Sequence, residues 1–156
     1  MIVCEFEDGG KGKLRHVTIG ALSVNNRNEV LLVKRATPHR FGKYTIPGGF
    51  LDRDEDTKSA VLRELKEETG YDGKIKFLFY FNDNPKRSKE DRQNVDVVYV
   101  VEVIGGNLTL NREASEIKWF SKENLPNDDD FAFDHRGTIL KYFEYLEKPF
   151  NLPILN

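Results

Sequence analysis

Acidic residues between positions 49 and 71 have the spacing of a site that binds cations. The segment reads GFLDRDEDTKSAVLRELKEETGY. On a helix that turns about 100° per residue, Glu64, Glu67 and Glu68 fall within an arc of about 100°. Carboxylates crowded on one face repel one another, but together they suit a hard cation such as Mg²⁺ or Mn²⁺. The spacing therefore predicts a divalent-metal site, and the ordinary alternative is a solvated acidic face with ion pairs such as Arg63 with Glu67.

The same segment contains start and stop signals for the helix that would present these carboxylates. Asp56 or Thr57 can cap its start, where negative charge also suits the positive end of the helix dipole. Gly70 can end it, because glycine tolerates the left-handed conformation of a C-cap. About 13 residues lie between these signals, most of them good helix formers and none of them proline.

The side of this helix opposite the carboxylates is expected to face the core. Leu62, Leu65 and Thr69 lie on that side, with Val61 at its edge. Ala60 falls on the acidic face, where its small side chain would let a ligand approach.

A proline and two glycines precede the acidic segment. Pro47-Gly48-Gly49 predicts a tight loop whose backbone amides can approach a phosphate. Alone, such a tripeptide signals only a turn. Next to the acidic helix, it makes Gly48 and Gly49 candidate substrate-binding residues.

Residues 49–71, from Gly49 to Tyr71, resemble the Nudix box, G-x5-E-x7-R-E-U-x-E-E-x-G-U, where U is a bulky aliphatic residue. With each fixed residue at roughly 7% abundance, a chance match in a chain of this length is about one in a million, so the resemblance is specific. Tyr71 replaces the last aliphatic residue, but it is bulky enough to pack in the same way.

The resemblance implies a role for each acidic residue of the box. Glu64, Glu67 and Glu68 would be metal ligands, Glu55 would be a ligand or a support, and Arg63 would orient the carboxylates. Mg²⁺ or Mn²⁺ held there would neutralise a pyrophosphate and lower the pKa of a bound water. The implied activity is hydrolysis of the pyrophosphate bond of a small nucleotide.

A general base for this reaction is expected outside the box. Members of the family often place a glutamate just before a strand that bears a tryptophan. Glu113 and Glu116 in EASEIKW are therefore the first candidates, and Glu90 and Asp91 compete with them. The ordinary interpretation of each is a surface carboxylate.

A long polar loop is expected to select the substrate. Residues 82–94 (NDNPKRSKEDRQN) are more than a hairpin needs, and loops of that kind are often functional. This loop and the segment FAFDHRGTILKYF resemble Nudix hydrolases of the ADP-ribose type, in which a proline lies about as far beyond the box as Pro85 does here. A single loop proline otherwise predicts only a turn. The candidate substrate-binding residues are Arg35, Tyr44, Gly48, Gly49, Pro85 and Arg87.

Three functions are compatible with these residues. The favoured one is cleavage of an ADP-ribose-like nucleoside diphosphate derivative. A MutT-type nucleoside triphosphate pyrophosphohydrolase would use the same box with a different leaving group. A non-catalytic nucleotide-binding sensor belongs to another class, and sensors tend to lose box carboxylates that are all present here.

Composition limits the possible partners. The chain has 156 residues, 38% of them hydrophobic and 32% charged, which predicts a single globular domain over residues 1–156. The chain has a net charge of −2 and therefore lacks the excess of basic residues that is typical of a nucleic-acid-binding protein. The apolar run at the N-terminus is too short for a signal peptide or membrane span, so a cytoplasmic location is expected. A homodimer is compatible with the sequence, which does not settle the oligomeric state.

Strand-like segments surround the box helix. We expect strands at 16–24, 29–35, 44–46, 74–81, 95–104 and 117–120, with a turn at 105–107 and an acidic loop at 127–130. A helix is expected over about 135–146, capped by Asp134, with Ile139, Leu140, Phe143 and Leu146 as its apolar stripe. The sequence does not decide whether the tail NLPILN packs or frays. This order predicts an α/β protein with a mixed sheet between helices, an α/β/α sandwich. The resemblance implies the Nudix fold.

Overall fold

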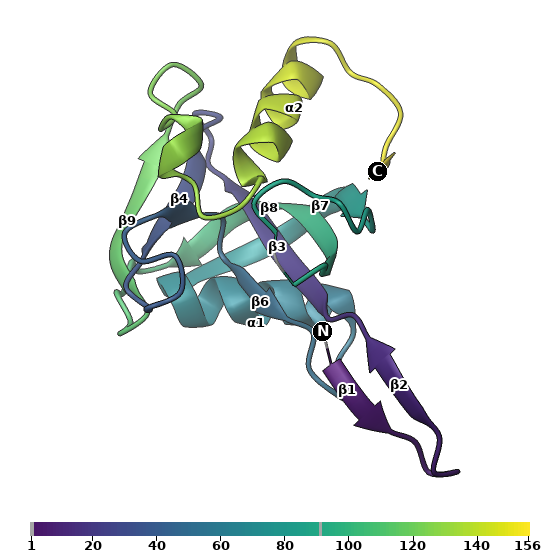
Figure 1. Cartoon of the computed structure of the whole chain (residues 1–156). Helices are drawn as coiled ribbons and strands as arrows, with labels where there is room; N and C mark the ends of the chain where they lie inside the picture. The colour runs from purple at the N-terminus through teal and green to yellow at the C-terminus, as the bar shows by residue number, and fades with distance from the viewer. Residues whose placement is uncertain (1, 91) are drawn as a thin grey trace.

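The computed structural model describes residues 2–90 and 92–156, which form one large mixed sheet, a small hairpin, two α-helices and a short 3₁₀ helix (Figure 1). The strands are β1 (Ile2–Glu5), β2 (Lys11–Leu14), β3 (Val17–Val24), β4 (Val30–Arg35), β5 (Tyr44–Thr45), β6 (Gly48–Phe50), β7 (Tyr71–Asn82), β8 (Val95–Gly106), β9 (Ala114–Phe120) and β10 (Ile154–Leu155). The helices are α1 (Thr57–Thr69), α2 (His135–Glu147) and the short 3₁₀ helix η1 (Asp128–Asp130).

Strand β3 is the centre of the large sheet. The strand order is β10-β7-β8-β3-β4-β5, with β6 paired to β3 and β9 paired to β4. β3 runs parallel to β8, with Val17 opposite Val95, and antiparallel to β6, with Gly20 opposite Gly48. These pairings bring the segment before the box helix beside the middle of the sheet.

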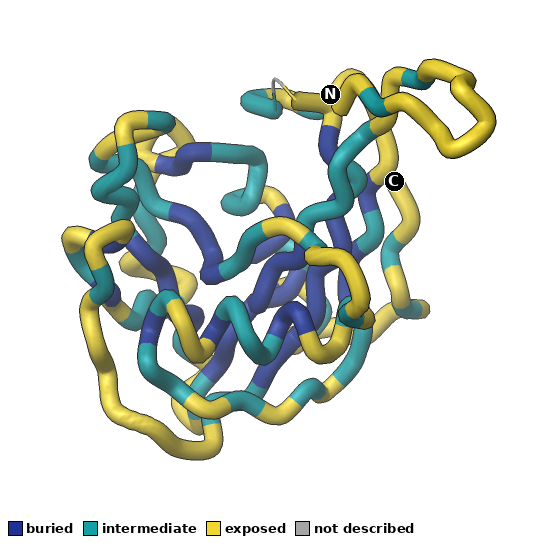
Figure 2. Tube along the Cα trace, turned by 90° about the horizontal axis from the view of Figure 1, so that it is seen from below, coloured by how far each residue is buried: buried dark blue, intermediate teal, exposed yellow. Residues whose placement is uncertain are grey.

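Alternation along β3 divides the core between the two faces of the sheet. Ile19 and Ala21 pack with the α1 residues Val61 and Leu65, whereas Leu22 belongs to the cluster that includes buried residues of α2. Successive side chains of a strand point to opposite faces, so one strand supplies both clusters. Figure 2 shows the buried residues gathered in the middle of the molecule and the exposed ones at its edge. The expected α/β/α sandwich is confirmed.

The ends of α1 are as predicted. The Asp56 carboxylate accepts hydrogen bonds from the backbone N–H groups of Lys58 and Ser59, at 2.9 and 2.8 Å. Gly70 ends the helix with φ 77°, in the left-handed region. Both are interactions between near neighbours in sequence, and this is why the residue types alone predict them.

The predicted orientation of α1 was partly wrong. Leu65 and Thr69 are buried as expected, but Leu62 is only partly buried. Ala60, expected on the open acidic face, is fully buried with Val61. The helix approaches the sheet over the side that also bears Glu64 and Glu68, and these two carboxylates therefore border the core.

The tripeptide before the box is not a tight loop. Gly48 and Gly49 belong to β6 and pair with β3 in an antiparallel ladder. A Cβ on Gly48 would lie 2.1 Å from the Ile19 carbonyl oxygen, so only glycine permits this close approach. The glycines therefore let a strand fit between β3 and α1.

The predicted polar cap and apolar stripe of α2 need correction. Asp134 stands at the N-cap position without a capping bond from its side chain to the described backbone, because its carboxylate binds Arg87 instead. Ile139 and Phe143 are buried as predicted, whereas Leu140 is only partly buried and Leu146 is exposed. Tyr142 is buried in their place, with its ring packed edge-on against Phe79 at 5.8 Å. This aromatic packing turns the helix toward β7.

Several elements differ from the sequence prediction. The hairpin β1–β2 was not predicted and projects away from the sheet (Figure 1). The tail is packed, since β10 adds to the edge of the sheet parallel to β7. β8 continues through Gly106, where a turn was expected, because β7 begins at Tyr71 and pairs with it. No helix in residues 2–90 and 92–156 is long and apolar enough to cross a bilayer.

Candidate active site

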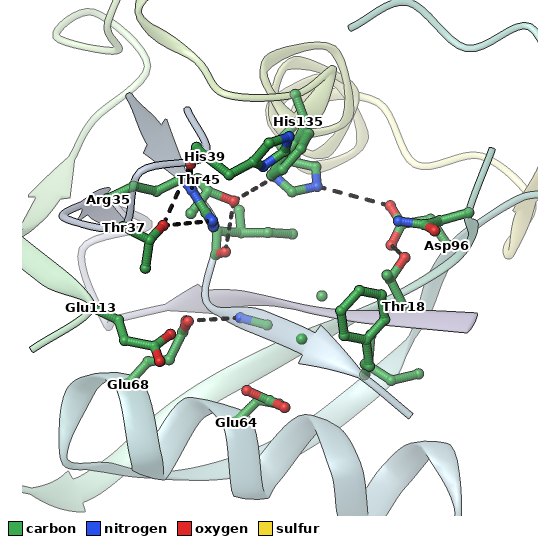
Figure 3. A pocket seen from close by; sticks show the side chains of 18 of the residues that line it. Thr18, Arg35, Thr37, His39, Thr45, Glu64, Glu68, Asp96, Glu113 and His135 are labelled. Atoms are coloured by element: carbon green, nitrogen blue, oxygen red, sulfur yellow. Dashed lines mark hydrogen bonds and ion pairs between the residues drawn. The ribbon is translucent and has the colours of Figure 1, made fainter. Parts of the chain in front are cut away.

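A cavity of about 700 Å³ lies where β3, β6 and α1 meet the loops before β5, before β8 and before α2 (Figure 3). Its lining includes Glu64, Glu67 and Glu68 from α1. A volume of this size is in the range of sites for nucleotide-sized ligands. The box helix thus forms one wall of the cavity.

Two glutamates on this wall are partly withdrawn from water. The backbone N–H of Gly48 donates to Glu68 Oε2 at 3.0 Å. Burial raises the pKa of Glu68 to about 7, against the opposing effect of this bond, and the nearby Glu64 charge adds to the rise. Burial also raises the pKa of Glu64, although Arg63 opposes it. A cation beside these groups would stabilise their charged forms.

Arg63 organises the acidic residues of the box. Its Nη2 and Nε atoms donate to the two oxygens of Glu55, at 2.6 and 3.1 Å. Its Nη1 atom donates to Glu64 Oε1 at 2.8 Å and to Glu67 Oε2 at 3.2 Å. Both Glu55 oxygens are therefore engaged, and Glu55 is not among the described residues that line the cavity. In this arrangement Glu55 is a support for Arg63.

The donor set fits a hard divalent cation by its chemistry. The α1 wall presents carboxylate oxygens, which are the ligands that Mg²⁺ and Mn²⁺ prefer. Within residues 2–90 and 92–156, however, no three acidic, histidine or cysteine side chains are close enough to form a ready-made cage. Glu67 is 60% exposed and pairs with Arg63. The wall therefore offers suitable ligands without a closed coordination sphere.

The candidate bases are separated by the fold. Glu113 lines the cavity, and its charge is close enough to affect the pKa of Glu68. Glu116 lies elsewhere on β9, where it accepts a hydrogen bond from the Tyr44 hydroxyl at 2.5 Å and pairs with Lys118. Neither Glu116 nor Tyr44 is among the described residues that line the cavity.

The competing acidic candidates lie in the loop before β8. Glu90 lines the cavity, and Asp91 lies outside the described residues. Glu113 therefore meets two criteria: it precedes the strand that bears Trp119, and it lies beside the box carboxylates at the cavity.

The candidate substrate-binding residues are also divided. Arg35, Gly48, Gly49 and Arg87 line the cavity. Pro85 is exposed, and the described lining does not include it.

Arg35 is held in place by neighbouring groups. It donates to the His39 carbonyl at 3.0 Å and to Thr37 Oγ1 at 2.9 Å, with its guanidinium 5.7 Å from the centre of the Phe133 ring. It is therefore a cation in a fixed position on the cavity wall.

Arg87, a candidate substrate-binding residue, is buried and paired with two acidic side chains. Its side chain is 3% exposed and binds Asp134 through two hydrogen bonds, of 2.6 and 3.0 Å. A third bond of 3.2 Å reaches Asp96. Burial would raise the pKa of Asp134, but the bonds and charge of Arg87 hold it below its ordinary value. The two carboxylates neutralise Arg87, which thereby ties the loop to α2 and β8.

Sequence reasoning missed two polar residues opposite the box helix. Asp96 and His135 line the cavity, with His135 Nδ1 3.0 Å from Thr45 Oγ1 and Nε2 3.9 Å from Asp96 Oδ2. Burial lowers the pKa of His135, although the Asp96 charge opposes this. Asp96 had a detectable signal, because it is the only charged residue in the otherwise apolar run VDVVYVV. A buried charge of this kind needs a specific partner.

Comparisons with known proteins agree with this geometry. A family model described as NUDIX domain matches residues 14–142. The ADP-ribose pyrophosphatase of Methanocaldococcus jannaschii is 35% identical over 122 residues, which cover 78% of this chain and 70% of that protein. The NAD-capped RNA hydrolase NudC of Vibrio atlanticus is 32% identical over 107 residues, which are 68% of this chain but only 38% of that protein.

A solved structure extends the comparison to the fold. The NUDIX hydrolase from Nitrosomonas europaea superposes with a TM-score of 0.81 at 23% identity. The superposition covers 94% of this chain and 81% of that one. At this identity the likeness shows the shared fold.

Gly49→Ala is expected to disturb the acidic wall without unfolding the protein. A Cβ at position 49 would lie 2.4 Å from Glu64 Oε1, so Glu64 must move. We expect Mn²⁺ affinity, measured by electron paramagnetic resonance, to fall on the order of tenfold, as it does when groups that support metal ligands are changed. Gly137→Ala is the control, because a Cβ there meets nothing within 4 Å. Unchanged Mn²⁺ affinity in a folded Gly49→Ala protein would contradict the prediction.

Arg63→Lys is expected to impair turnover more than stability. Lysine cannot reproduce the forked contacts to Glu55 and Glu64, so kcat should fall by about tenfold or more. The unfolding temperature should change little, because partly exposed ion pairs contribute little stability. Arg53→Lys, at a side chain that is 94% exposed, serves as the control. A normal kcat would show that Arg63 is only a surface partner.

Proposed function

Because the chain belongs to the Nudix family of hydrolases, we propose that it cleaves the pyrophosphate bond of a nucleoside diphosphate derivative, with ADP-ribose-like compounds favoured. The observation that supports this most directly is the pair Glu64 and Glu68, withdrawn from water on one wall of a nucleotide-sized cavity. Carboxylates in such a position serve a reaction in which anionic charge must be neutralised.

A divalent metal ion is part of the proposal. Glu64, Glu67 and Glu68 would hold Mg²⁺ or Mn²⁺, which supplies charge neutralisation and activation of a bound water. Arg63 orients Glu64 and Glu67 through its hydrogen bonds. The Gly48 amide orients Glu68.

The remaining roles belong to residues on other elements. Glu113 is the favoured general base, since it borders the cavity near Glu68 and can hold a proton taken from the attacking water. Arg35, fixed against Phe133, is placed to contact a phosphate or a ribose.

A relative of this chain supports the preference for ADP-ribose. The Methanocaldococcus jannaschii protein shares 35% identity and is an ADP-ribose pyrophosphatase by name. The NudC relatives, which are NAD-capped RNA hydrolases by name, make an NAD-type dinucleotide a second candidate. The matches cover 68% of this chain for the Vibrio atlanticus protein and 64% for the Escherichia coli O157:H7 protein. All these compounds share a diphosphate between two groups that contain ribose.

Activity is expected to depend on the metal and on Glu68. EDTA should abolish hydrolysis, and added Mg²⁺ or Mn²⁺ should restore it. Glu68→Gln keeps an acceptor for the Gly48 amide but loses the charge, so kcat should fall by a factor on the order of 10². Glu102→Gln, at a side chain on β8 that is 45% exposed and lies outside the described cavity lining, is the matched control. Full activity in EDTA, or a normal kcat for Glu68→Gln, would disprove the metal site.

A substrate panel tests the favoured substrate. We expect kcat/KM for ADP-ribose, cleaved to AMP and ribose 5-phosphate, to exceed the values for ATP, 8-oxo-dGTP and NADH. Product identity is measured by chromatography in the presence of Mg²⁺. A preference for 8-oxo-dGTP would reject the ADP-ribose assignment in favour of the MutT-type reaction. A preference for NADH would favour the NudC-type substrate.

A further inference from the structure

The wall of the cavity opposite the box helix has a different chemistry. Figure 3 shows Glu64, Glu68 and Glu113 on one side, with His135 and Asp96 across the cavity from them. Asp96 comes from β8 and His135 from the first position of α2. The function proposed above assigns no role to either residue.

The hydrogen bonds of Thr45 determine which His135 nitrogen carries the proton. Thr45 Oγ1 lies 3.0 Å from the Ile46 carbonyl oxygen, which can only accept, so the hydroxyl donates there. Oγ1 must then accept from His135 Nδ1–H, at 3.0 Å. Burial lowers the pKa of this ring, and in the neutral ring with its proton on Nδ1 the Nε2 atom has a lone pair. His135 therefore presents an acceptor beside Asp96.

Asp96 is also an acceptor. Its Oδ1 accepts from the Thr18 hydroxyl at 2.9 Å, and its Oδ2 accepts from Arg87 at 3.2 Å. Oδ2 lies 3.9 Å from His135 Nε2, which is too long for a hydrogen bond. Within the described residues, no hydrogen-bond donor reaches Nε2. Two hydrogen-bond acceptors, His135 Nε2 and Asp96 Oδ2, thus lie side by side on the cavity wall.

The separation of these acceptors selects among the groups of a nucleotide. An amino group that donated to both, with bonds of about 2.9 Å, would hold them about 5 Å apart. A phosphate oxygen has no hydrogen to donate, and it would face a carboxylate. Two adjacent hydroxyl groups, about 2.8 Å apart, can each donate one hydrogen to acceptors spaced like these. Ribose supplies such a pair.

We propose that Asp96 and His135 bind a pair of neighbouring hydroxyl groups on a ribose of the substrate. Asp96 is suited to this because Arg87 compensates its charge, while Thr18 and Arg87 hold its two oxygens in place. Arg87 is itself neutralised by Asp96 and Asp134, so it offers no free charge to a further phosphate beside these two acceptors. The subsite would therefore favour a sugar-bearing diphosphate over a triphosphate.

This inference rests on the proposed function, in which the substrate has two ribose groups. The nucleoside ribose and the terminal ribose of ADP-ribose carry the same diol. Two analogues distinguish them: ADP-ribose built on 2′,3′-dideoxyadenosine, and an ADP ester of tetrahydrofurfuryl alcohol, which keeps the terminal ring without its hydroxyl groups.

The experiment compares substrates that lack the hydroxyl groups in the wild-type protein and in variants that lack His135. In the wild-type protein, KM for one of the two analogues should be about tenfold or more above KM for ADP-ribose, because hydrogen bonds to a charged group are lost. The effect on kcat should be smaller. In His135→Phe, the KM values for that analogue and for ADP-ribose should differ by less than about twofold, since the acceptor pair is already broken. His135→Gln, which retains a polar group, should recover part of the discrimination.

Control variants separate this effect from altered packing. Tyr142 lies on the same helix as His135 but is buried in the core. Tyr142→Phe removes its hydroxyl group, and the KM for each analogue relative to ADP-ribose should stay as in the wild type. Thermal unfolding reports whether each variant is folded. If His135→Phe does not fold, the KM values of the wild type provide the test. Equal KM values for ADP-ribose and both analogues would show that the subsite does not exist.

The outcomes remain distinct from those of the proposed function. A penalty for one analogue that disappears in His135→Phe supports the subsite and identifies the ribose. Penalties that persist unchanged in that variant, or are absent from the wild type, overturn it. If the wild type does not hydrolyse ADP-ribose, the proposed substrate fails first. The same comparison then uses the best nucleotide and its 2′,3′-dideoxy form.

Discussion

Burial of two carboxylates against a β-sheet is the constraint on which the rest of this site depends. Removing a carboxylate from water costs several kcal/mol unless other groups compensate its charge. Glu64 is compensated by Arg63, and Glu68 only by the Gly48 amide and more distant charges. β6 can bring that amide close because Gly48 and Gly49 leave room between β3 and α1. The remaining need for positive charge explains why a cation would bind on this wall.

The opposite wall satisfies a similar need from within the protein. Asp96 and Asp134 are also buried carboxylates, and Arg87 binds both of them. These ion pairs fix the loop before β8 against the start of α2. Because one arginine faces two aspartates, this group has no free cation and only one net negative charge, and its chemistry therefore differs from that of the box helix. One end of the cavity is suited to charge neutralisation and the other to recognition of polar, uncharged groups.

The strand pairing explains which of the candidate residues reach the cavity. Glu113 precedes β9 and borders the cavity, whereas Glu116 lies within β9 opposite Lys34 and binds Tyr44. A shift of a few residues along a strand decides whether a side chain enters a site or a surface cluster. α2 is drawn toward β7 by aromatic packing, and its first residue, His135, is thereby placed over the cavity.

The sequence by itself determined the box helix, its two caps and the hydrogen bonds of Arg63 to Glu55, Glu64 and Glu67. These depend on partners between one and eight residues apart, so the residue types and their spacing contain the information. Only the tertiary structure decided that Arg87 is buried, that Asp134 binds it rather than capping α2, and that His135 meets Thr45. Those partners lie 47 and 90 residues apart, and only the packing of α2 across the sheet brings them together. A side chain chooses its partner by distance in space, which local spacing does not determine.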